Sequence, residues 1–187
     1  MATSNILIVD DEHSVITALK RSFLDDNYEV FSAGSAAEGL AILSKHKIKV
    51  VISDEMMPGM SGADFLVRVS SHFPDVVRIM LTGQASLAAA IKAINKGEIY
   101  RFFTKPWDDF ELRFAVKSAV EKFDLSEENR RLIDIVKKQA LNMKLIEKEF
   151  PGITQLEYDE KGRIIAQDVS DEEVGQIMAQ LEKEYKA

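Results

Sequence analysis

The first two thirds of the sequence alternate short runs of β-branched and aromatic residues with amphipathic helical stretches. This alternation is typical of an α/β fold, because parallel strands are joined by crossovers that place a helix against the sheet. The expected strands are NILIVD at 5–10, EVFSA at 29–33, KVVISD at 49–54, VVRIML at 76–81 and YRFFT at 100–104. The pattern therefore predicts a doubly wound, five-stranded parallel sheet within residues 1–123.

Helix-start signals fall in the gaps between these strands. A hydroxyl or carboxylate at the position before a helix caps the backbone N–H three residues later, where an acidic residue is favoured. The sequence contains this pattern three times, in Ser35 with Glu38, Ser61 with Asp64, and Asp108 with Glu111. We expect a helix to begin at each of these places.

Composition limits the kind of protein this chain forms. The 187 residues, 46% of them hydrophobic, suffice for one domain of ordinary size and an appendage. With no cysteine there is no disulfide or thiolate metal site, which fits a reducing compartment. The polar start MATSN lacks the features of a secretory signal, and no run is long enough to span a bilayer. We therefore expect a cytoplasmic protein that is not bound to a membrane.

The helix that begins near Asp108 has no stop signal before Pro151. Its second half repeats at alternating steps of four and three residues, which is the spacing of a coiled-coil seam. The seam residues are Leu125, Asn129, Leu132, Val136, Gln139, Met143, Ile146 and Phe150. We expect a long linker helix over 124–150 that joins two copies of the chain as a homodimer. The alternative is a solvated connector helix that packs back on its own domain.

Residues 151–187 have a different pattern. Two short strand-like runs flank DEKG at 159–162, which predicts a hairpin, and Ser170 with Glu173 predicts a last helix to about Tyr185. Nine acidic and four basic residues give this small α+β tail a net charge of −5, and the whole chain has −7. Direct DNA binding is therefore not expected. We expect this tail to contact an output partner protein, which the sequence does not identify.

Polar residues follow the expected strands at the point where each one ends. Asp10 and Asp11 end the first run, Asp54 ends the third, Thr82 follows the fourth and Lys105 follows the fifth. Ligands of doubly wound sheets bind beyond the carboxyl ends of the strands. If the strand order is 2-1-3-4-5, the first and third strands are neighbours and the three acids meet in one pocket.

Three carboxylates that lie side by side need a counter-charge, because like charges raise one another's pKa. A hard, all-oxygen ligand set favours Mg²⁺, and Mn²⁺ is a possible substitute. Such a site suits phosphoryl transfer, in which the metal and a lysine neutralise charge and a threonine donates a hydrogen bond. An aspartate is a competent nucleophile toward phosphorus. Glu12 and Glu55, beside these acids, are expected to be solvated.

Four motifs, IVDDE, SDEMMPG, LTG and FFTKPWD, together resemble the receiver domain of bacterial two-component response regulators over residues 4–123. The resemblance implies a flavodoxin-like fold with strand order 2-1-3-4-5. It also implies a signalling switch, not a metabolic enzyme, that takes a phosphoryl group from a sensor histidine kinase or phosphotransfer protein. Its only chemistry would be its own phosphorylation and slow dephosphorylation.

The resemblance assigns the metal and acceptor roles residue by residue. Asp54 would be the phosphorylated aspartate. Asp11 and Asp54 would bind Mg²⁺ directly, Asp10 would act through water, and the backbone carbonyl of Met56 would complete the set.

The resemblance also assigns the switch residues. Thr82 and Lys105 would each hold a phosphoryl oxygen. Phe102 would be the aromatic residue that turns inward when Thr82 moves, and the Lys105–Pro106 peptide bond would be cis.

Three alternatives remain at this point. The chain is the start of a longer regulator with an enzymatic output such as a cyclic-dinucleotide phosphodiesterase, or it is an Mg²⁺-dependent aspartate phosphatase, or it is a flavin-binding protein of the same topology. The phosphatase carries its nucleophile on the first strand in a DxD motif, whereas here the first-strand acids are adjacent. The flavin alternative is disfavoured because DEHSV after the first strand is acidic and has no glycine.

Overall fold

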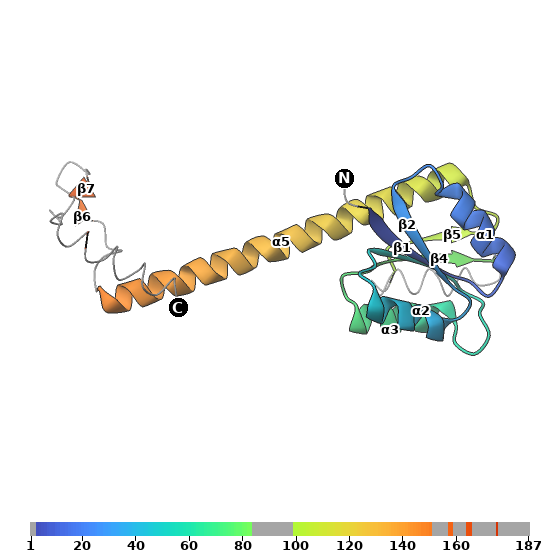
Figure 1. Cartoon of the computed structure of the whole chain (residues 1–187), viewed down its shortest axis with the longest axis horizontal. Coiled ribbons are helices and arrows are strands. Elements are labelled where there is room, and N and C mark those ends of the chain that lie inside the picture. The colour runs from blue at the N-terminus through green and yellow to red at the C-terminus, as the bar shows by residue number, and fades with distance from the viewer. Residues whose placement is uncertain (1–2, 84–98, 151–156, 159–163, 166–174, 176–187) are drawn as a thin grey trace. The chain divides into compact units, whose positions relative to one another are not determined.

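The computed structural model describes residues 3–83, 99–150, 157–158, 164–165 and 175. The chain divides into two compact units, Met1–Leu132 and Ile133–Ala187. The first unit is an α/β domain with a single sheet (Figure 1). The helical stretch expected between the fourth and fifth strands lies outside the described residues.

The five strands of the first unit lie close to their expected positions. They are β1 (Ser4–Val9), β2 (Tyr28–Ala33), β3 (Val50–Asp54), β4 (Val77–Thr82) and β5 (Arg101–Thr104). They form one parallel sheet in the order β2-β1-β3-β4-β5, so the predicted order is confirmed. This order makes β1 and β3 neighbours and brings their carboxyl ends to the same edge.

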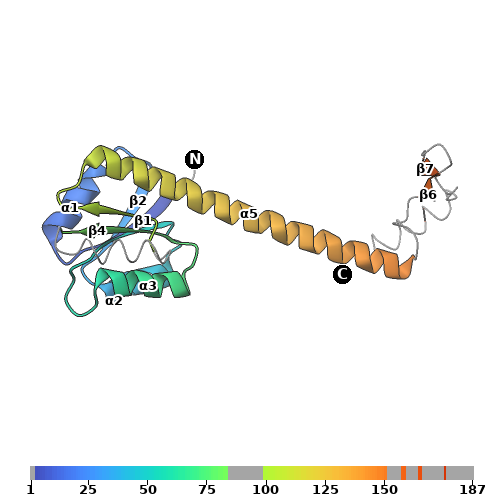
Figure 2. The same cartoon turned by 180° about the vertical axis from the view of Figure 1, so that it is seen from behind.

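Helices cover both faces of the sheet (Figures 1 and 2). Helix α1 (His13–Ser22) and the part of α5 (Asp109–Glu149) through Phe123 lie against one face, and α2 (Ala36–Lys45) and α3 (Gly62–His72) lie against the other. Successive strand residues point to opposite faces, so Ile6 and Ile8 join the core under α1 and α5, while Leu7 and Val9 join the core under α2 and α3. The central strands β1 and β3 are mostly apolar because both of their faces are buried.

All three expected helix starts are formed. The Ser35 hydroxyl accepts from the Glu38 N–H at 3.3 Å, and the Ser61 hydroxyl accepts from the Asp64 N–H at 3.1 Å. The Asp108 carboxylate accepts from the Glu111 N–H at 2.9 Å. These bonds satisfy amides that have no partner within the helix, so the chain direction is fixed where each helix begins.

The last helix of the first unit, α5, continues through the unit boundary to Glu149. In the second unit, β6 (Glu157–Tyr158) pairs antiparallel with β7 (Ile164–Ile165), as the predicted hairpin requires. The helix expected from Ser170 lies outside the described residues except for Gly175. None of the helices in the described part of the chain is long and apolar enough to cross a membrane.

Candidate functional site

The carboxyl edge of the sheet brings Asp10, Asp54 and Lys105 together, and we call them the carboxyl-edge cluster. Asp54 is the last residue of β3, Asp10 follows β1 and Lys105 follows β5. The Lys105 Nζ lies 2.6 Å from Asp54 Oδ1 and 2.8 Å from Asp10 Oδ2. Both carboxylates are buried, with 5% of Asp54 and 1% of Asp10 exposed. One ammonium group thus joins two buried acids from different strands.

Backbone amides hold the second oxygen of each acid. The Met56 N–H donates to Asp54 Oδ2 at 2.8 Å, and the Glu12 N–H donates to Asp10 Oδ1 at 2.9 Å. Every carboxylate oxygen in the cluster therefore has one described donor, and each oxygen has a second lone pair for another ligand. The acids are held rigidly yet keep the capacity to bind something else.

A close backbone contact shapes the loop after Asp54. A Cβ added at Gly62, the first residue of α3, would lie 1.9 Å from the backbone oxygen of Asp54. The Gly62 N–H also donates to the Glu55 carbonyl at 2.9 Å. Only glycine allows this approach, so Gly62 helps to set the position of the Asp54 backbone.

The expectation that Glu55 is solvated is wrong, since only 6% of this residue is exposed. Its Oε2 accepts from the Ala63 N–H at 2.9 Å, at the beginning of α3. Burial raises the pKa of Glu55, the hydrogen bond from Ala63 lowers it, and the charges of Asp54 and Asp64 raise it further. Helix N-termini favour negative charge, which explains why an acid beside Asp54 turns inward.

Burial and the neighbouring charges shift the pKa values of Asp10 and Lys105. Burial raises the pKa of Asp10 above its ordinary value, and the neighbouring Asp54 charge adds to this, while hydrogen bonds from Lys105 and Glu12 oppose it. Burial by itself would lower the pKa of Lys105, but hydrogen bonds to Asp10 and Asp54 raise it overall. Lys105 is therefore a stable cation beside two acids that benefit from a positive charge.

The remaining candidate residues lie at or near the same edge. Thr82, the last residue of β4, is fully buried, and its hydroxyl donates to the Gly83 carbonyl at 3.1 Å. The Lys105 N–H donates to the Thr82 carbonyl at 2.8 Å, which ties the ends of β4 and β5 together. Phe102 is half-buried and packs against the core under α2 and α3. The Lys105–Pro106 peptide bond is cis.

Asp11 directly follows Asp10, and Met56 lies two residues after Asp54 in the sequence. The Asp11 residue is exposed, and 70% of Met56 is exposed. Over the described ranges, no three histidine or acidic side chains are grouped closely enough to form a metal centre on their own. Two of the three expected acids, Asp10 and Asp54, meet at Lys105, because its ammonium offsets the repulsion between them.

The family model described as the response regulator receiver domain matches residues 6–117 of this chain. The chain belongs to this family. The chain is 35% identical over 129 residues to the hydrogenase transcriptional regulatory protein HoxA of Cupriavidus necator. This match covers 69% of this chain and 27% of HoxA. It is 31% identical over 117 residues to the sporulation initiation phosphotransferase F of Bacillus subtilis, covering 63% of this chain and 94% of that protein.

Solved structures give the same result. The signal receiver domain of an HD domain-containing protein from Pseudomonas fluorescens Pf-5 is 35% identical, with a TM-score of 0.65, and the match covers 68% of this chain and 94% of that one.

The matched part is a small share of the HoxA regulators. The match covers 27% of HoxA from Cupriavidus necator and 32% of HoxA from Bradyrhizobium diazoefficiens. The chain therefore spans a third or less of the length of these HoxA proteins.

The donor chemistry of the receiver site fits a small, hard divalent cation. Asp10, Asp11 and Asp54 offer only oxygen atoms, and the single positive charge of Lys105 does not balance them. Mg²⁺ prefers this kind of ligand and takes one or two carboxylates together with water. Receiver domains in general use Mg²⁺ in phosphorylation, and the residues present here are compatible with it.

Proposed function

We propose that Asp54 is the residue of this receiver that accepts the phosphoryl group. The observation that carries the proposal is the buried Asp54 carboxylate, 2.6 Å from the Lys105 ammonium at the carboxyl edge of the sheet. A buried acid that is held by a lysine and a backbone amide is costly for stability, which makes a chemical role the better explanation.

The reaction is a phosphoryl transfer from a phosphohistidine of a sensor kinase or phosphotransfer protein. An Asp54 carboxylate oxygen forms a bond to phosphorus while the bond from phosphorus to the histidine nitrogen breaks, and the freed imidazole takes up a proton. The products are an aspartyl phosphate and a neutral histidine. Lys105 stays protonated and offsets the charge on the transferred group.

Asp11 and Asp54 would bind Mg²⁺ directly, Asp10 would act through a water molecule, and the Met56 carbonyl would complete the protein ligands. The cation would supply charge neutralisation for the phosphoryl oxygens. The exposure of Asp11 supports this assignment, since a ligand from solvent reaches it without opening the core.

Thr82 and Lys105 would hold two oxygens of the phosphoryl group and carry the switch. The buried Thr82 hydroxyl now donates to Gly83, so engaging a phosphoryl oxygen requires it to turn. Phe102 lies on β5, beside β4, and would fill the space that Thr82 leaves. The phosphoryl group carries a charge of about −1.5 to −2 in place of the single negative charge of the carboxylate, and it brings three acceptor oxygens, which is sufficient to bias such a two-state element.

The chain organisation that fits this function has a receiver over 1–123, a linker helix over 124–150 and a small acidic module over 151–187. The continuous helix α5 supports the linker assignment. Its exposed seam supports a homodimer: 69% of Leu125, 50% of Leu132 and 62% of Val136 is exposed in one chain. The acidic module would contact an output protein.

The acceptor is tested by incubating the protein with acetyl phosphate and Mg²⁺ and locating any added phosphoryl group by intact and peptide mass spectrometry. We expect one phosphoryl group on Asp54 in the wild type and none in Asp54→Asn. Asp25→Asn, which removes an exposed acid from the loop before β2, is the matched control and should be modified normally. Modification of Asp54→Asn at the wild-type rate would refute the assignment.

The dimer is tested separately by measuring mass with and without beryllofluoride, which mimics the phosphoryl group. We expect the dimer fraction to rise when the mimic is bound. A monomer under both conditions would refute the dimer and leave the acceptor assignment untouched.

A further inference from the structure

The opposite edge of the sheet, where the strands begin, holds α5 by a set of ion pairs. Lys49, just before β3, pairs with Asp124 at 2.6 Å between Nζ and Oδ1. Lys47 pairs with Glu127, and Asp75, in the loop before β4, pairs with Arg130. We call these three pairs the amino-edge clamp. All six residues belong to the first unit, although three of them lie beyond the last buried residue of α5, Phe123.

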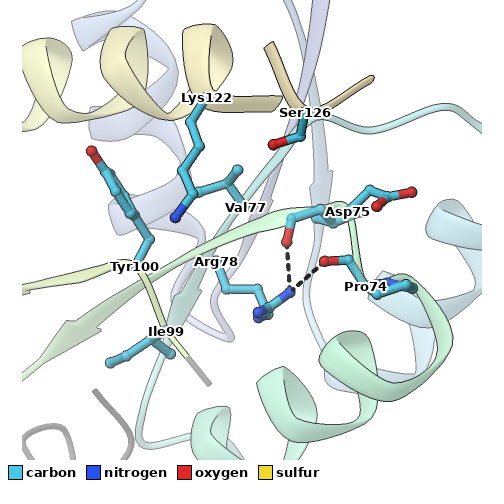
Figure 3. A pocket seen from close by; sticks show the side chains of 9 residues that line it. Pro74, Asp75, Val77, Arg78, Ile99, Tyr100, Lys122 and Ser126 are labelled. Carbon is cyan, nitrogen blue, oxygen red and sulfur yellow. Dashed lines mark hydrogen bonds between the residues drawn. The ribbon is translucent and has the colours of Figure 1, made fainter. Parts of the chain in front are cut away.

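Two cation–π contacts support the clamp. The Lys122 Nζ lies 4.8 Å from the centre of the Tyr100 ring, and the Lys47 Nζ lies 5.8 Å from the Phe123 ring. A pocket of about 310 Å³ separates this part of α5 from the beginnings of β4 and β5, and Figure 3 shows Lys122 and Tyr100 together at its side. Beyond Phe123 the helix is therefore held by side-chain charges and not by a close-packed core.

Helix geometry relates the clamp to the seam. Each residue turns an α-helix by about 100°, so Asp124, Glu127 and Arg130 form one stripe centred on Glu127. Measured from Glu127, Leu125 and Asn129 lie about 160° away and Leu132 lies about 140° away. The clamp and the seam thus occupy opposite faces of the same helix. The large exposed fractions of Leu125 and Leu132 agree with this geometry.

We propose that the amino-edge clamp fixes the rotation of α5 on its receiver so that the seam residues Leu125, Asn129 and Leu132 face a second copy of the chain. The inference rests on the proposed dimer and adds how the receiver orients it. A second copy is the fitting occupant, because the 4-3 spacing of the seam is matched by another helix with the same spacing. The seam repeats to Phe150, which gives this partner a long contact.

The facing side of the helix is tested by disulfide cross-linking, which the absence of native cysteine makes clean. Two single variants are oxidised under identical conditions: Leu132→Cys, on the seam, and Arg131→Cys, which is exposed and lies about 40° from Glu127 on the clamp side of the helix. We expect Leu132→Cys to cross-link about tenfold faster, since only seam positions of paired helices come within disulfide distance. Equal rates in a dimer, or faster Arg131→Cys, would overturn the proposed rotation.

The clamp itself is tested by a triple variant, Asp124→Asn, Glu127→Gln and Arg130→Gln. Its control is Glu128→Gln, Arg131→Gln and Asp134→Asn, which changes the same residue types outside the clamp. We expect amide hydrogens of residues 124–132 to exchange about fivefold faster in the clamp variant than in the control, because the helix loosens from the receiver. With spin labels attached at Asp25→Cys, we expect a single narrow distance between the two receivers of a dimer. We expect this distance distribution to broaden in the clamp variant and to stay narrow in the control.

These measurements separate the two levels of the proposal. Absence of both dimer and cross-link refutes the proposed dimer, and with it the assignment of the seam to a second copy. Equal exchange in the clamp and control variants refutes the clamp in monomer and dimer alike. A dimer whose receiver distance is unchanged in the clamp variant also refutes the clamp, while the dimer stands.

Discussion

The two edges of the receiver sheet carry ion pairs of the same kind in different surroundings. At the carboxyl edge, the side chain of Asp54 is 6% exposed where it meets Lys105. At the amino edge, the side chain of Asp124 is 48% exposed where it meets Lys49, while the two lysine side chains are similarly covered, with 18% of Lys49 and 22% of Lys105 exposed, so the edges differ in the burial of the acid. A lysine–aspartate pair in water gains little and costs little, whereas a buried pair pays a large desolvation cost that its attraction does not always repay.

The contrast in burial assigns a different role to each edge. Burial raises the pKa of Asp10, so the carboxyl-edge cluster favours a partner that brings more positive charge. The acids of the amino-edge clamp are more exposed, so their ion pairs carry a smaller desolvation cost. The role we assign to these pairs is to hold α5 in place. A buried cluster suits chemistry, and a row of exposed pairs suits the orientation of a helix.

The largest expected effect is on the phosphorylation rate. Lys105→Met removes the ammonium that offsets charge at Asp54, and removal of one such donor typically costs about 100-fold in rate. Lys49→Met removes a similar lysine from the amino edge and should leave the rate unchanged. The rate of phosphoryl incorporation from acetyl phosphate, followed by mass spectrometry, measures both. Equal rates for the two variants would remove the functional distinction between the edges.

The next effect is on stability at the carboxyl edge. Gly62→Ala places a methyl group 1.9 Å from the Asp54 backbone oxygen, so backbone has to move. We expect a loss of about 2–4 kcal/mol in the free energy of unfolding, measured by urea denaturation.

Gly34→Ala is the matched control for this variant. The atom nearest to an added Cβ at Gly34 is a flexible Glu38 oxygen at 3.7 Å, so the change should be less than about 1 kcal/mol. If Gly62→Ala is as stable as Gly34→Ala, the backbone contact does not constrain the loop after Asp54.

Much of the carboxyl edge was predictable from the sequence, because strand ends are visible in it. Asp10, Asp54 and Lys105 each follow an apolar run, and the order 2-1-3-4-5 brings the ends of the first and third runs together. The burial of Glu55 was not predicted, because its position beside Asp54 suggested a solvated loop. The helix start at Ser61 and Gly62 was the available signal, since the first backbone amides of a helix need an acceptor, and Glu55 accepts from the Ala63 amide.

The amino edge was not predictable in the same way. Lys47, Lys49 and Asp75 are ordinary surface residues in short loops, and nothing local marks them. Their partners are 75 or 80 positions away for the two lysines, on a helix whose continuation past the domain was expected but whose rotation was not. Heptad spacing reveals which residues share a face and leaves open which way that face points.

A third prediction concerns metal binding at the carboxyl edge. If Asp11 is a ligand, Mg²⁺ at a hundred times its Kd should stabilise the folded receiver by about 2.7 kcal/mol, which raises its thermal midpoint by several degrees. Asp11→Asn should lose most of this shift. Asp75→Asn, an acid removed from the amino edge, should keep it. An equal shift in all three proteins, measured by calorimetry, would show that Mg²⁺ acts without Asp11.

The smallest effect is the energy of a single amino-edge pair. A double-mutant cycle of Lys49→Met and Asp124→Asn should give a coupling of about 0.2–1 kcal/mol at low salt, as exposed pairs do. In 1 M salt the screening length falls to about 3 Å and the coupling should nearly vanish. Urea denaturation at both salt concentrations measures it.

The same cycle on Lys105→Met and Asp54→Asn provides the contrast between the edges. This pair is largely shielded from solvent ions by burial, so its coupling should change far less between low and high salt. If the two cycles depend on salt to the same degree, burial does not separate the edges electrostatically. A small coupling that salt screens in each clamp pair would explain why the amino edge has three pairs in a row. One such pair is too weak to fix the rotation of α5, whereas three pairs together restrict it.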